Sequence, residues 1–221
     1  MRASGVILAA GRGVRFGGEK ALAPLRGLPL LRRCADAFAS SGAVEELVVV
    51  ARPGGEGKVA DVLSGLPLPW RVVPGGERRQ DSTRAGVEAA RGEYVLVHDA
   101  ARPLVSPELI RRVLAAAREH EAAVPVIPAV DTVRYLNERG FLRPGDVSRT
   151  GLVRVQTPQG FRRELLLEAL EHADREGLSL TDDAAALLAQ GLPVAAVPGD
   201  PVNLKITHPQ DLKLAEALLL A

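Results

Sequence analysis

The sequence predicts a three-layer α/β fold built around a mostly parallel β-sheet. Short apolar runs without alternating polar residues, typical of strands buried on both faces, recur along the chain. Amphipathic segments with helical spacing lie between them, and such alternation is typical of a parallel sheet covered by helices. With 221 residues, 47% of them hydrophobic, the chain is long enough for a full core, so we expect residues 1–221 to form a single domain.

The strands and helices are expected in the following order. The first apolar run, residues 5–8, is followed by a helix at 29–41 and a second buried strand at 46–51. The alternation continues with helices at 57–63, 78–90 and 107–120, each followed by a strand, at 70–73, 94–97 and 122–127. Farther on we expect helices at 162–174, 182–190 and 209–220 and a strand at 194–197. In such a sheet, ligands bind at the loops that follow the carboxyl ends of the strands.

Residues 129–156 depart from this alternation and predict a protruding β-arm. Val130, Val133 and Tyr135 alternate with other residues, two polar turns follow, and a second alternating segment ends near Val155. Because an isolated two-stranded hairpin is marginally stable, we expect the arm to pack against another subunit in a homodimer. The alternative is a flexible surface loop.

The segment 4–20 runs from the first strand directly into a glycine-rich, basic loop. Its glycines let the backbone approach a ligand and present N–H groups, and Arg12, Arg15 and Lys20 add positive charge. A P-loop is excluded because no Ser or Thr follows Lys20, and the glycine spacing does not fit a dinucleotide-binding turn. The loop therefore predicts a triphosphate site, with a glycine-rich surface turn as the alternative.

Lysine is rare in this chain and marks candidate sites. Among 28 basic residues, only Lys20, Lys58, Lys205 and Lys213 are lysines. A lysine retained among so many arginines favours a function that needs a compact point charge. Lys20 and Lys205 lie in predicted loops, whereas the other two lie in predicted helices, so the first two are the candidates.

Two more loops at predicted strand ends carry polar residues. In the loop 74–82, Gly76 and Ser82 permit close approach of a nucleoside, and Asp81 or Ser82 is expected to cap a helix that begins near Thr83. The alternative for this loop is a simple turn. Asp99 follows an apolar strand, where its carboxylate is placed to bind a hard cation that bridges phosphates, unless it only caps a turn or helix.

Composition and charge exclude several classes of partner. A formal net charge of +1, with basic residues spread along the chain, gives no field that attracts nucleic acid or a membrane surface. The four histidines show no ligand spacing for zinc, and the single Cys34 has no disulfide partner. The N-terminal apolar run is too short for a signal peptide, so we expect a soluble, cytoplasmic protein.

These motifs together resemble the 2-C-methyl-D-erythritol 4-phosphate cytidylyltransferases of the non-mevalonate isoprenoid pathway. The resemblance covers nearly the whole chain and is carried in order by Leu8-Ala-Ala-Gly-Arg-Gly-Val-Arg15, Gly75-Gly76 to Asp81-Ser82, His98-Asp-Ala-Ala-Arg-Pro103, Asp131-Thr132, Gln156-Thr-Pro-Gln159, Thr181-Asp182-Asp183 and Asn203-Leu-Lys-Ile-Thr207. It implies a Rossmann-like nucleotidyltransferase sheet and Mg²⁺-dependent transfer of CMP from CTP to the polyol phosphate, with release of pyrophosphate.

The resemblance also implies a role for each matching residue. Arg15 and Lys20 stabilise charge on the triphosphate, Arg149 and Lys205 position the phosphate of the second substrate, and Asp99 holds Mg²⁺. The cytidine contacts correspond to Ala9, Ala10, Gly11, Gly76 and Ser82, and the second substrate is surrounded by Arg102, Thr132, Thr157 and Thr181. The chain departs from the family pattern at Glu19, where proline is usual, at Phe16, and in a short loop before Lys20.

Two other functions remain open on the sequence. A ribitol 5-phosphate cytidylyltransferase shares most of these motifs and uses a similar polyol phosphate. A non-catalytic nucleotide-binding regulator could keep the fold and lose the chemistry, although the presence of Arg15, Lys20, Asp99 and Lys205 argues against it.

Overall fold

The fold is centred on strand β1 (Ala3–Leu8), which pairs in parallel with β6 (Tyr94–Asp99) and β4 (Glu46–Ala51). Its residues 3–7 are buried, as expected for an apolar run covered on both faces. Beyond β4, the parallel strand β5 (Trp70–Pro74) ends this half of the sheet. The structure is a computed structural model that describes residues 1–11, 13 and 15–220.

The other half of the sheet contains an antiparallel strand that the sequence did not indicate. Strand β9 (Gln159–Arg162) lies between β6 and β7 (Ala122–Pro128) and runs opposite to both. Gly160 lets it approach helix α4 (Pro107–His120), since a Cβ there would lie 2.9 Å from Cβ of Ala117. Strand β10 (Ala195–Pro198) pairs in parallel with β7, so the predicted mostly parallel sheet is confirmed.

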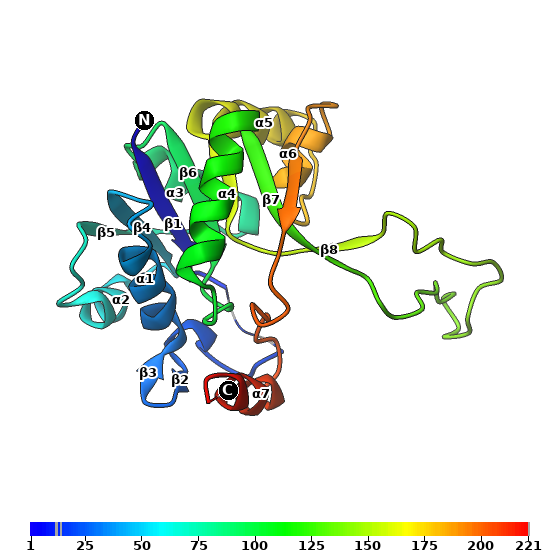
Figure 1. Ribbon diagram of the computed structural model, residues 1–221, viewed down its shortest axis with the longest axis horizontal. Coiled ribbons are helices and arrows are strands. Elements are labelled where there is room, and N and C mark those ends of the chain that lie inside the picture. Colours follow the sequence, from blue (N-terminus) through cyan, green and yellow to red (C-terminus); the bar gives the residue numbers. More distant parts are fainter. Residues whose placement is uncertain (12, 14, 221) are drawn as a thin grey trace.

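Three helices cover one face of the sheet. They are α1 (Leu30–Ser41), α2 (Glu56–Leu63) and α4 (Pro107–His120), and their apolar sides form one core with residues of the strands (Figure 1). Phe38 of α1 is fully buried in this core. The sequence predicted α4 with the same bounds. In the structure Ser106 caps its first turn, because the Ser106 hydroxyl accepts a hydrogen bond from Leu109 N–H (3.2 Å).

The opposite face is covered by α3 (Arg79–Ala89), α5 (Arg163–Arg175) and the short α6 (Ala184–Leu188). Helix α3 begins before Thr83, so the expected cap is wrong. Asp81 lies inside the first turn, and its carboxylate accepts a hydrogen bond from the backbone N–H of Arg78 (3.0 Å). An acidic side chain in the first turn can satisfy a free N–H group from within the helix, which sequence spacing alone does not reveal.

A small third core lies below the glycine-rich loop. The turn η1 (Lys20–Leu22) leads into a two-strand hairpin, β2 (Pro24–Leu25) and β3 (Leu28–Pro29), and the C-terminal helix α7 (Gln210–Leu218) packs beside it. The buried side chains of this core are Leu25, Leu30, Ile206 and Ala215. The core therefore joins the chain after Lys20 to the segment that carries Lys205.

Residues 129–152 leave the end of β7, extend away from the body of the molecule and return at β8 (Val153–Val155), which pairs antiparallel with β7 (Figure 1). A bridge between Leu136 and Leu142 closes a turn, in which the Asn137 side chain accepts a hydrogen bond from Phe141 N–H (2.9 Å). We call residues 129–156 the arm. Several of its large apolar side chains are exposed in the single chain, among them Tyr135, Leu136, Phe141 and Leu142.

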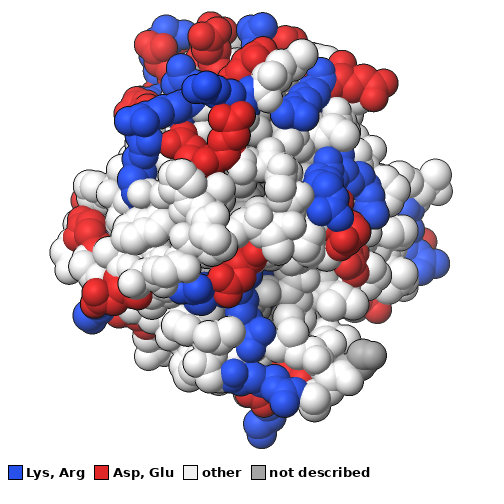
Figure 2. Space-filling view, turned by 60° about the vertical axis from the view of Figure 1, so that its left-hand side comes forward, with Lys and Arg blue, Asp and Glu red and all other residues white. Residues whose placement is uncertain are grey.

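The surface bears both signs of charge. Figure 2 shows Lys and Arg side chains interspersed with Asp and Glu on the face turned to the reader, which agrees with the small net charge of the chain. Within residues 1–11, 13 and 15–220, no helix is long and apolar enough to span a bilayer.

Candidate active site

A cavity of about 640 Å³ opens where β1, β4, β5 and β6 end. A nucleotide-sized ligand fits a volume of this order. Its lining contains Ala9, Ala10, Gly11, Lys20, Gly76, Ser82, Asp99 and Lys205 from the set predicted by the sequence. Loops that lie far apart in the chain thus meet at one edge of the sheet, as parallel strands require.

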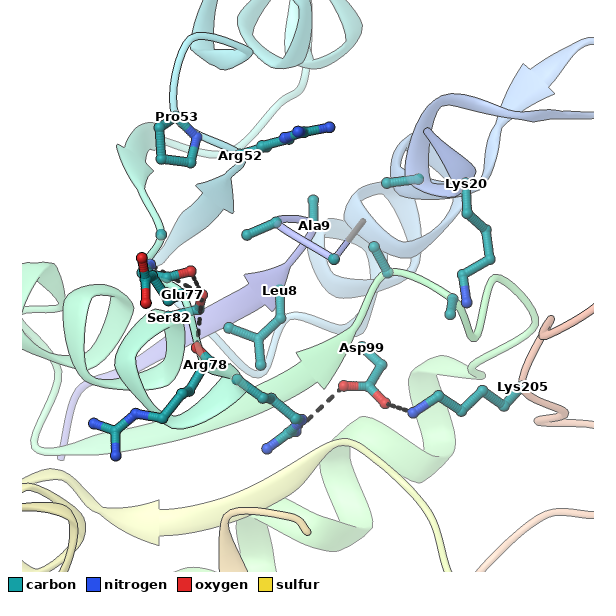
Figure 3. A pocket seen from close by; sticks show the side chains of 18 residues that line it. Leu8, Ala9, Lys20, Arg52, Pro53, Glu77, Arg78, Ser82, Asp99 and Lys205 are labelled. Carbon is teal, nitrogen blue, oxygen red and sulfur yellow. Dashed lines mark hydrogen bonds and ion pairs between the residues drawn. The ribbon is translucent and has the colours of Figure 1, made fainter. Parts of the chain in front are cut away.

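The Asp99 carboxylate lies on the floor of this cavity between two cations (Figure 3). Its Oδ2 atom accepts a 2.6 Å hydrogen bond from Lys205 Nζ, and its Oδ1 atom accepts one of 3.2 Å from Arg79 Nη2. Burial raises the pKa of Asp99, but the charges of Arg79 and Lys205 outweigh burial and hold that pKa well below its usual range. Asp99 is therefore ionised at neutral pH.

Lys20 lines the same cavity and lies on the glycine-rich loop that follows β1. Its Nζ atom donates a hydrogen bond to the backbone carbonyl of Ile206 (2.8 Å), next to Lys205. Burial lowers the pKa of Lys20, the positive charge of Lys205 lowers it further, and Asp99 partly opposes both effects. Two ammonium groups are thus held beside one carboxylate, an arrangement that an anionic ligand would stabilise.

The loop before Lys20 depends on glycine. Gly13 has φ +59°, and a Cβ there would collide with the carbonyl oxygen of Gly18, so only glycine fits. The Gly13 carbonyl accepts hydrogen bonds from the N–H groups of Phe16 and Gly17, at 2.8 Å each, which curls the loop. Arg15 is exposed in this turn and lies outside the cavity lining. The predicted cation Arg12 lies outside the described residues.

At another part of the cavity lining, the two glycines that follow β5 let this loop pack closely against its neighbours. A Cβ on Gly75 would lie 2.7 Å from Cβ of Ala10 and 2.7 Å from Oγ of Ser82. The buried Ser82 hydroxyl accepts a hydrogen bond from Gly76 N–H at 3.2 Å, which fixes the loop against α3. This part of the cavity thus combines small side chains with backbone groups, which suits recognition of a flat ring.

A buried hydrogen-bonded chain supports Asp99 from behind. The Thr157 hydroxyl accepts a hydrogen bond from Asp99 N–H (3.1 Å) and lies 3.0 Å from Nδ1 of His98, whose Nε2 lies 3.1 Å from the carbonyl of Arg102. A backbone carbonyl can only accept, so Nε2 of His98 carries a proton and donates to Arg102, and in the neutral imidazole Nδ1 then accepts from the Thr157 hydroxyl. Burial lowers the pKa of His98 to about 4, consistent with this assignment.

The remaining predicted residues lie outside the cavity lining. Arg102 donates a hydrogen bond to the carbonyl of Asn203 (2.8 Å) and so ties the loop after β6 to the segment that carries Lys205. Thr157 lies behind Asp99, and Thr181 is exposed before α6. Both Thr132 and Arg149 are exposed in the arm. The single chain therefore brings together the predicted nucleotide site and leaves Thr132 and Arg149 apart from it.

The structure adds residues that the sequence did not indicate. Arg79, in the first turn of α3, lines the cavity and forms two hydrogen bonds with Asp183, at 2.7 and 2.8 Å. Burial lowers the pKa of Arg79, but Asp183 and Asp99 outweigh burial and raise it. Arg52 and Pro53 lie across the cavity from Asp99 (Figure 3). Arg79 and Asp183 each lie within a motif that carries the family resemblance, but neither was given a role, because their contact joins segments distant in the chain.

Comparison with known proteins identifies the family. Residues 4–221 match the family described as 2-C-methyl-D-erythritol 4-phosphate cytidylyltransferase (IspD). The chain belongs to this family. The resemblance stated from the sequence motifs is therefore confirmed, and with it the assignment to the nucleotidyltransferase class of enzymes.

Individual cytidylyltransferases agree with this assignment. A Streptomyces coelicolor protein named 2-C-methyl-D-erythritol 4-phosphate cytidylyltransferase is 45% identical over 234 residues, which cover 99% of this chain and 85% of that protein. The crystal structure of the Thermus thermophilus enzyme of the same name gives a TM-score of 0.84 at 42% identity, with 100% of each chain covered. A bifunctional enzyme IspD/IspF of Anaeromyxobacter is 44% identical, and this chain spans 58% of its length.

The residues at the cytidylyltransferase cavity also fit a divalent cation bound together with a nucleotide. Within the described part of the chain, no group of three His, Cys, Asp or Glu residues converges, so the protein does not form a complete set of metal ligands there. Mg²⁺ is commonly held by one or two carboxylates, with the other ligands supplied by phosphate oxygens and water. Asp99 fits this role, because it is ionised and lies beside the cations that would bind the phosphates.

Proposed function

We propose that the protein transfers CMP from CTP to 2-C-methyl-D-erythritol 4-phosphate and releases pyrophosphate, as a cytoplasmic enzyme. The carrying observation is the convergence of Lys20, Lys205 and Asp99 in one cavity that is also lined by glycine and small side chains, in a chain of this family. The names of its relatives give the same activity. Isoprenoid precursor synthesis is then its pathway.

The reaction needs no general base from the protein. A phosphate monoester has a second pKa of about 6, so the phosphate of the polyol is already an anionic nucleophile at neutral pH. It attacks the α-phosphorus of CTP, a new P–O bond forms, and the bond to the pyrophosphate oxygen breaks. Lys205 and Arg149 position the attacking phosphate, and no proton transfer is required.

Charge stabilisation is the main task of the cavity. Negative charge develops on the α-phosphate oxygens and on the departing pyrophosphate, and cations fixed in advance stabilise it. Lys20 is held by Ile206 and, with Arg15 of the same loop, serves this purpose. Mg²⁺ on Asp99 would neutralise further phosphate charge.

The part of the cavity between the loops after β1 and β5 suits a pyrimidine base. Ala9, Ala10 and Gly11 at the end of β1 face Gly76 and Ser82 after β5, and all of them line the cavity. Backbone N–H and carbonyl groups there can read the edge of cytosine, and the close approach of the two loops leaves little width for a purine.

The second substrate site is completed by a partner subunit. Thr132 and Arg149 lie in the arm, whose exposed apolar side chains favour burial in a homodimer. We assign them to the polyol phosphate, together with Arg102 and Thr181. Thr157 acts on this site through its hydrogen bond to Asp99 N–H.

Pyrophosphate release tests this function directly. The enzyme is assayed with each of the four nucleoside triphosphates, with and without Mg²⁺, and with 2-C-methyl-D-erythritol 4-phosphate or ribitol 5-phosphate as acceptor. We expect release with CTP, Mg²⁺ and the methylerythritol phosphate, and a large loss in Lys20→Ala. Preference for ribitol 5-phosphate, for another nucleotide, or no turnover would contradict the proposal.

A further inference from the structure

We infer that Asp183 and Arg79 form a positioning pair that sets the orientation and the effective charge of Asp99. The inference deepens the proposed function and rests on it, because Asp99 is there the residue that binds Mg²⁺ with CTP. Neither Asp183 nor Arg79 is assigned a contact with substrate. They act through Asp99.

Asp183 is a rigid anchor for this pair. It is 1% exposed at the start of α6, and its Oδ1 atom accepts a hydrogen bond from the Thr83 hydroxyl (2.8 Å). Gln159 Oε1 accepts hydrogen bonds from the backbone N–H groups of Asp183 (3.1 Å) and Ala184 (3.0 Å), which fixes the backbone as well. Because several hydrogen bonds hold Asp183, its carboxylate can fix the orientation of Arg79, to which it is bonded.

Arg79 links Asp183 to Asp99 in the cavity. Its guanidinium uses Nη1 and Nη2 for Asp183, at 2.7 and 2.8 Å, and Nη2 also reaches Oδ1 of Asp99 at 3.2 Å. The planar fork of arginine gives such a contact a fixed direction, which a lysine would not. The other oxygen of Asp99 is held by Lys205.

This division of the carboxylate matters once phosphate groups are bound in the cavity. The Lys205 side chain is partly exposed, so it can turn to a bound phosphate, which would release Oδ2 of Asp99. Among the described residues, Arg79 is then the cation that still holds Asp99, through Oδ1 alone. Oδ2 would then be free to accept a cation.

The charge of Asp183 is as important as its position. Asp183, Arg79 and Asp99 form a row with two negative charges and one positive charge, in which both carboxylates are buried and Arg79 is partly exposed. Because Asp183 neutralises much of the Arg79 charge, Asp99 keeps its negative charge available for a cation. Without that neutralisation, Arg79 would face Asp99 as a full positive charge and compete with Mg²⁺ in a region of low dielectric.

Binding of Mn²⁺, a paramagnetic substitute for Mg²⁺, measures this effect without catalysis. Free Mn²⁺ is followed by electron paramagnetic resonance in the presence of enzyme and CTP, without the polyol phosphate, so no turnover occurs. Asp183→Asn keeps the size and one oxygen of the side chain and removes the charge. We expect its Mn²⁺ Kd to rise about tenfold or more.

A double variant separates charge from fold stability. Arg79→Gln with Asp183→Asn replaces the pair by two neutral amides and frees Asp99 from the competing cation. We expect its Mn²⁺ Kd to return to within about threefold of wild type. We expect its kcat to be lower than that of wild type, because Asp99 is no longer oriented. A purely structural role would make the double variant no better than the single one.

Asp174→Asn is the matched control. Asp174 also joins α5 to arginines of the α3 segment, through Arg84 at 2.7 Å and Arg78 at 2.9 Å, but it does not contact Asp99. We expect its Mn²⁺ Kd to equal that of wild type, and thermal unfolding of every variant reports any loss of fold.

The outcomes distinguish this inference from the proposed function. Wild-type enzyme that binds no Mn²⁺ with CTP would contradict the metal role of Asp99, and both would fall. Wild type that binds Mn²⁺, with Asp183→Asn equal to it or with no recovery in the double variant, would overturn the positioning pair alone.

Discussion

The predicted site residues of the cavity are held by hydrogen bonds, whereas those of the arm are exposed. In the cavity, Lys20, Asp99 and Lys205 are each fixed by a hydrogen bond to another part of the fold. In the arm, Thr132 and Arg149 are exposed on a segment that extends away from the body (Figure 1). The predicted nucleotide site is thus preformed within one chain, whereas in our proposal Thr132 and Arg149 need the surface of a partner subunit to reach the second substrate.

The largest expected effect concerns Asp99 in the cavity. Asp99→Asn removes the negative charge that lies between Arg79 and Lys205, and we expect Mg²⁺-dependent turnover to fall by roughly 10³ or more. The fold should persist, because Arg79 keeps its bidentate partner Asp183 and Lys205 remains accessible to solvent. Initial rates across a Mg²⁺ series, with thermal unfolding as the control, check this. Wild-type dependence on Mg²⁺ in the variant would exclude Asp99 as the metal ligand.

Lys20→Ala is expected to have the next largest effect. In the proposed mechanism its ammonium group stabilises charge that develops only during the reaction, so kcat should fall by roughly 10² or more while the Kd of CTP changes little. Arg15→Ala should act in the same direction. Steady-state kinetics and CTP titration calorimetry separate the two parameters. A change confined to KM would show that these cations only bind the ground state.

The same contrast describes what the sequence could predict. Regular apolar spacing predicted β4 and α4 with their observed bounds, since each buries a continuous face and little else decides it. Strand β9 escaped because Gln159 and Gly160 break the apolar pattern, and its place between β6 and β7 depends on residues distant in the chain.

Site residues divide in a similar way. Asp99, Lys20 and Lys205 could be predicted because an unusual residue followed a strand or stood in a loop. Arg79 could not, because its role depends on Asp183 and Asp99, which fold next to it from other elements. Thr157 was placed among the substrate contacts by resemblance, and only the structure locates its hydroxyl between Asp99 N–H and His98.

Subunit mixing tests whether the arm serves the partner's cavity. Homodimers that carry only Lys20→Ala are mixed with homodimers that carry only Arg149→Ala, and subunits are allowed to exchange. In a mixed dimer with arms acting in trans, one site carries both changes and the other is intact. With random exchange, half of the dimers are mixed, so about a quarter of wild-type activity should return.

Activity returns after subunit exchange only if Arg149 serves the partner's cavity. If Arg149 serves its own subunit, every site retains one change and no activity returns. Exchange is therefore demonstrated independently, with differently tagged subunits recovered together. Absence of recovery after that demonstration, or full activity in a monomer by sedimentation, would contradict the trans arrangement.

The smallest expected effect is a shift in pH dependence. It sharpens the comparison of cavity and arm, because only the hydrogen-bonded residues of the cavity predict it. Burial and Lys205 lower the pKa of Lys20, and the proposed mechanism needs its charged form. As pH rises through this lowered pKa, the charge is lost, so kcat/KM should decline at a pH below that of an ordinary lysine. Lys20→Arg should move this decline to higher pH, since a guanidinium remains charged, whereas Lys213→Arg, an exposed lysine of α7, should leave it unchanged. An alkaline limb that stays in place in Lys20→Arg would assign the titration to another group.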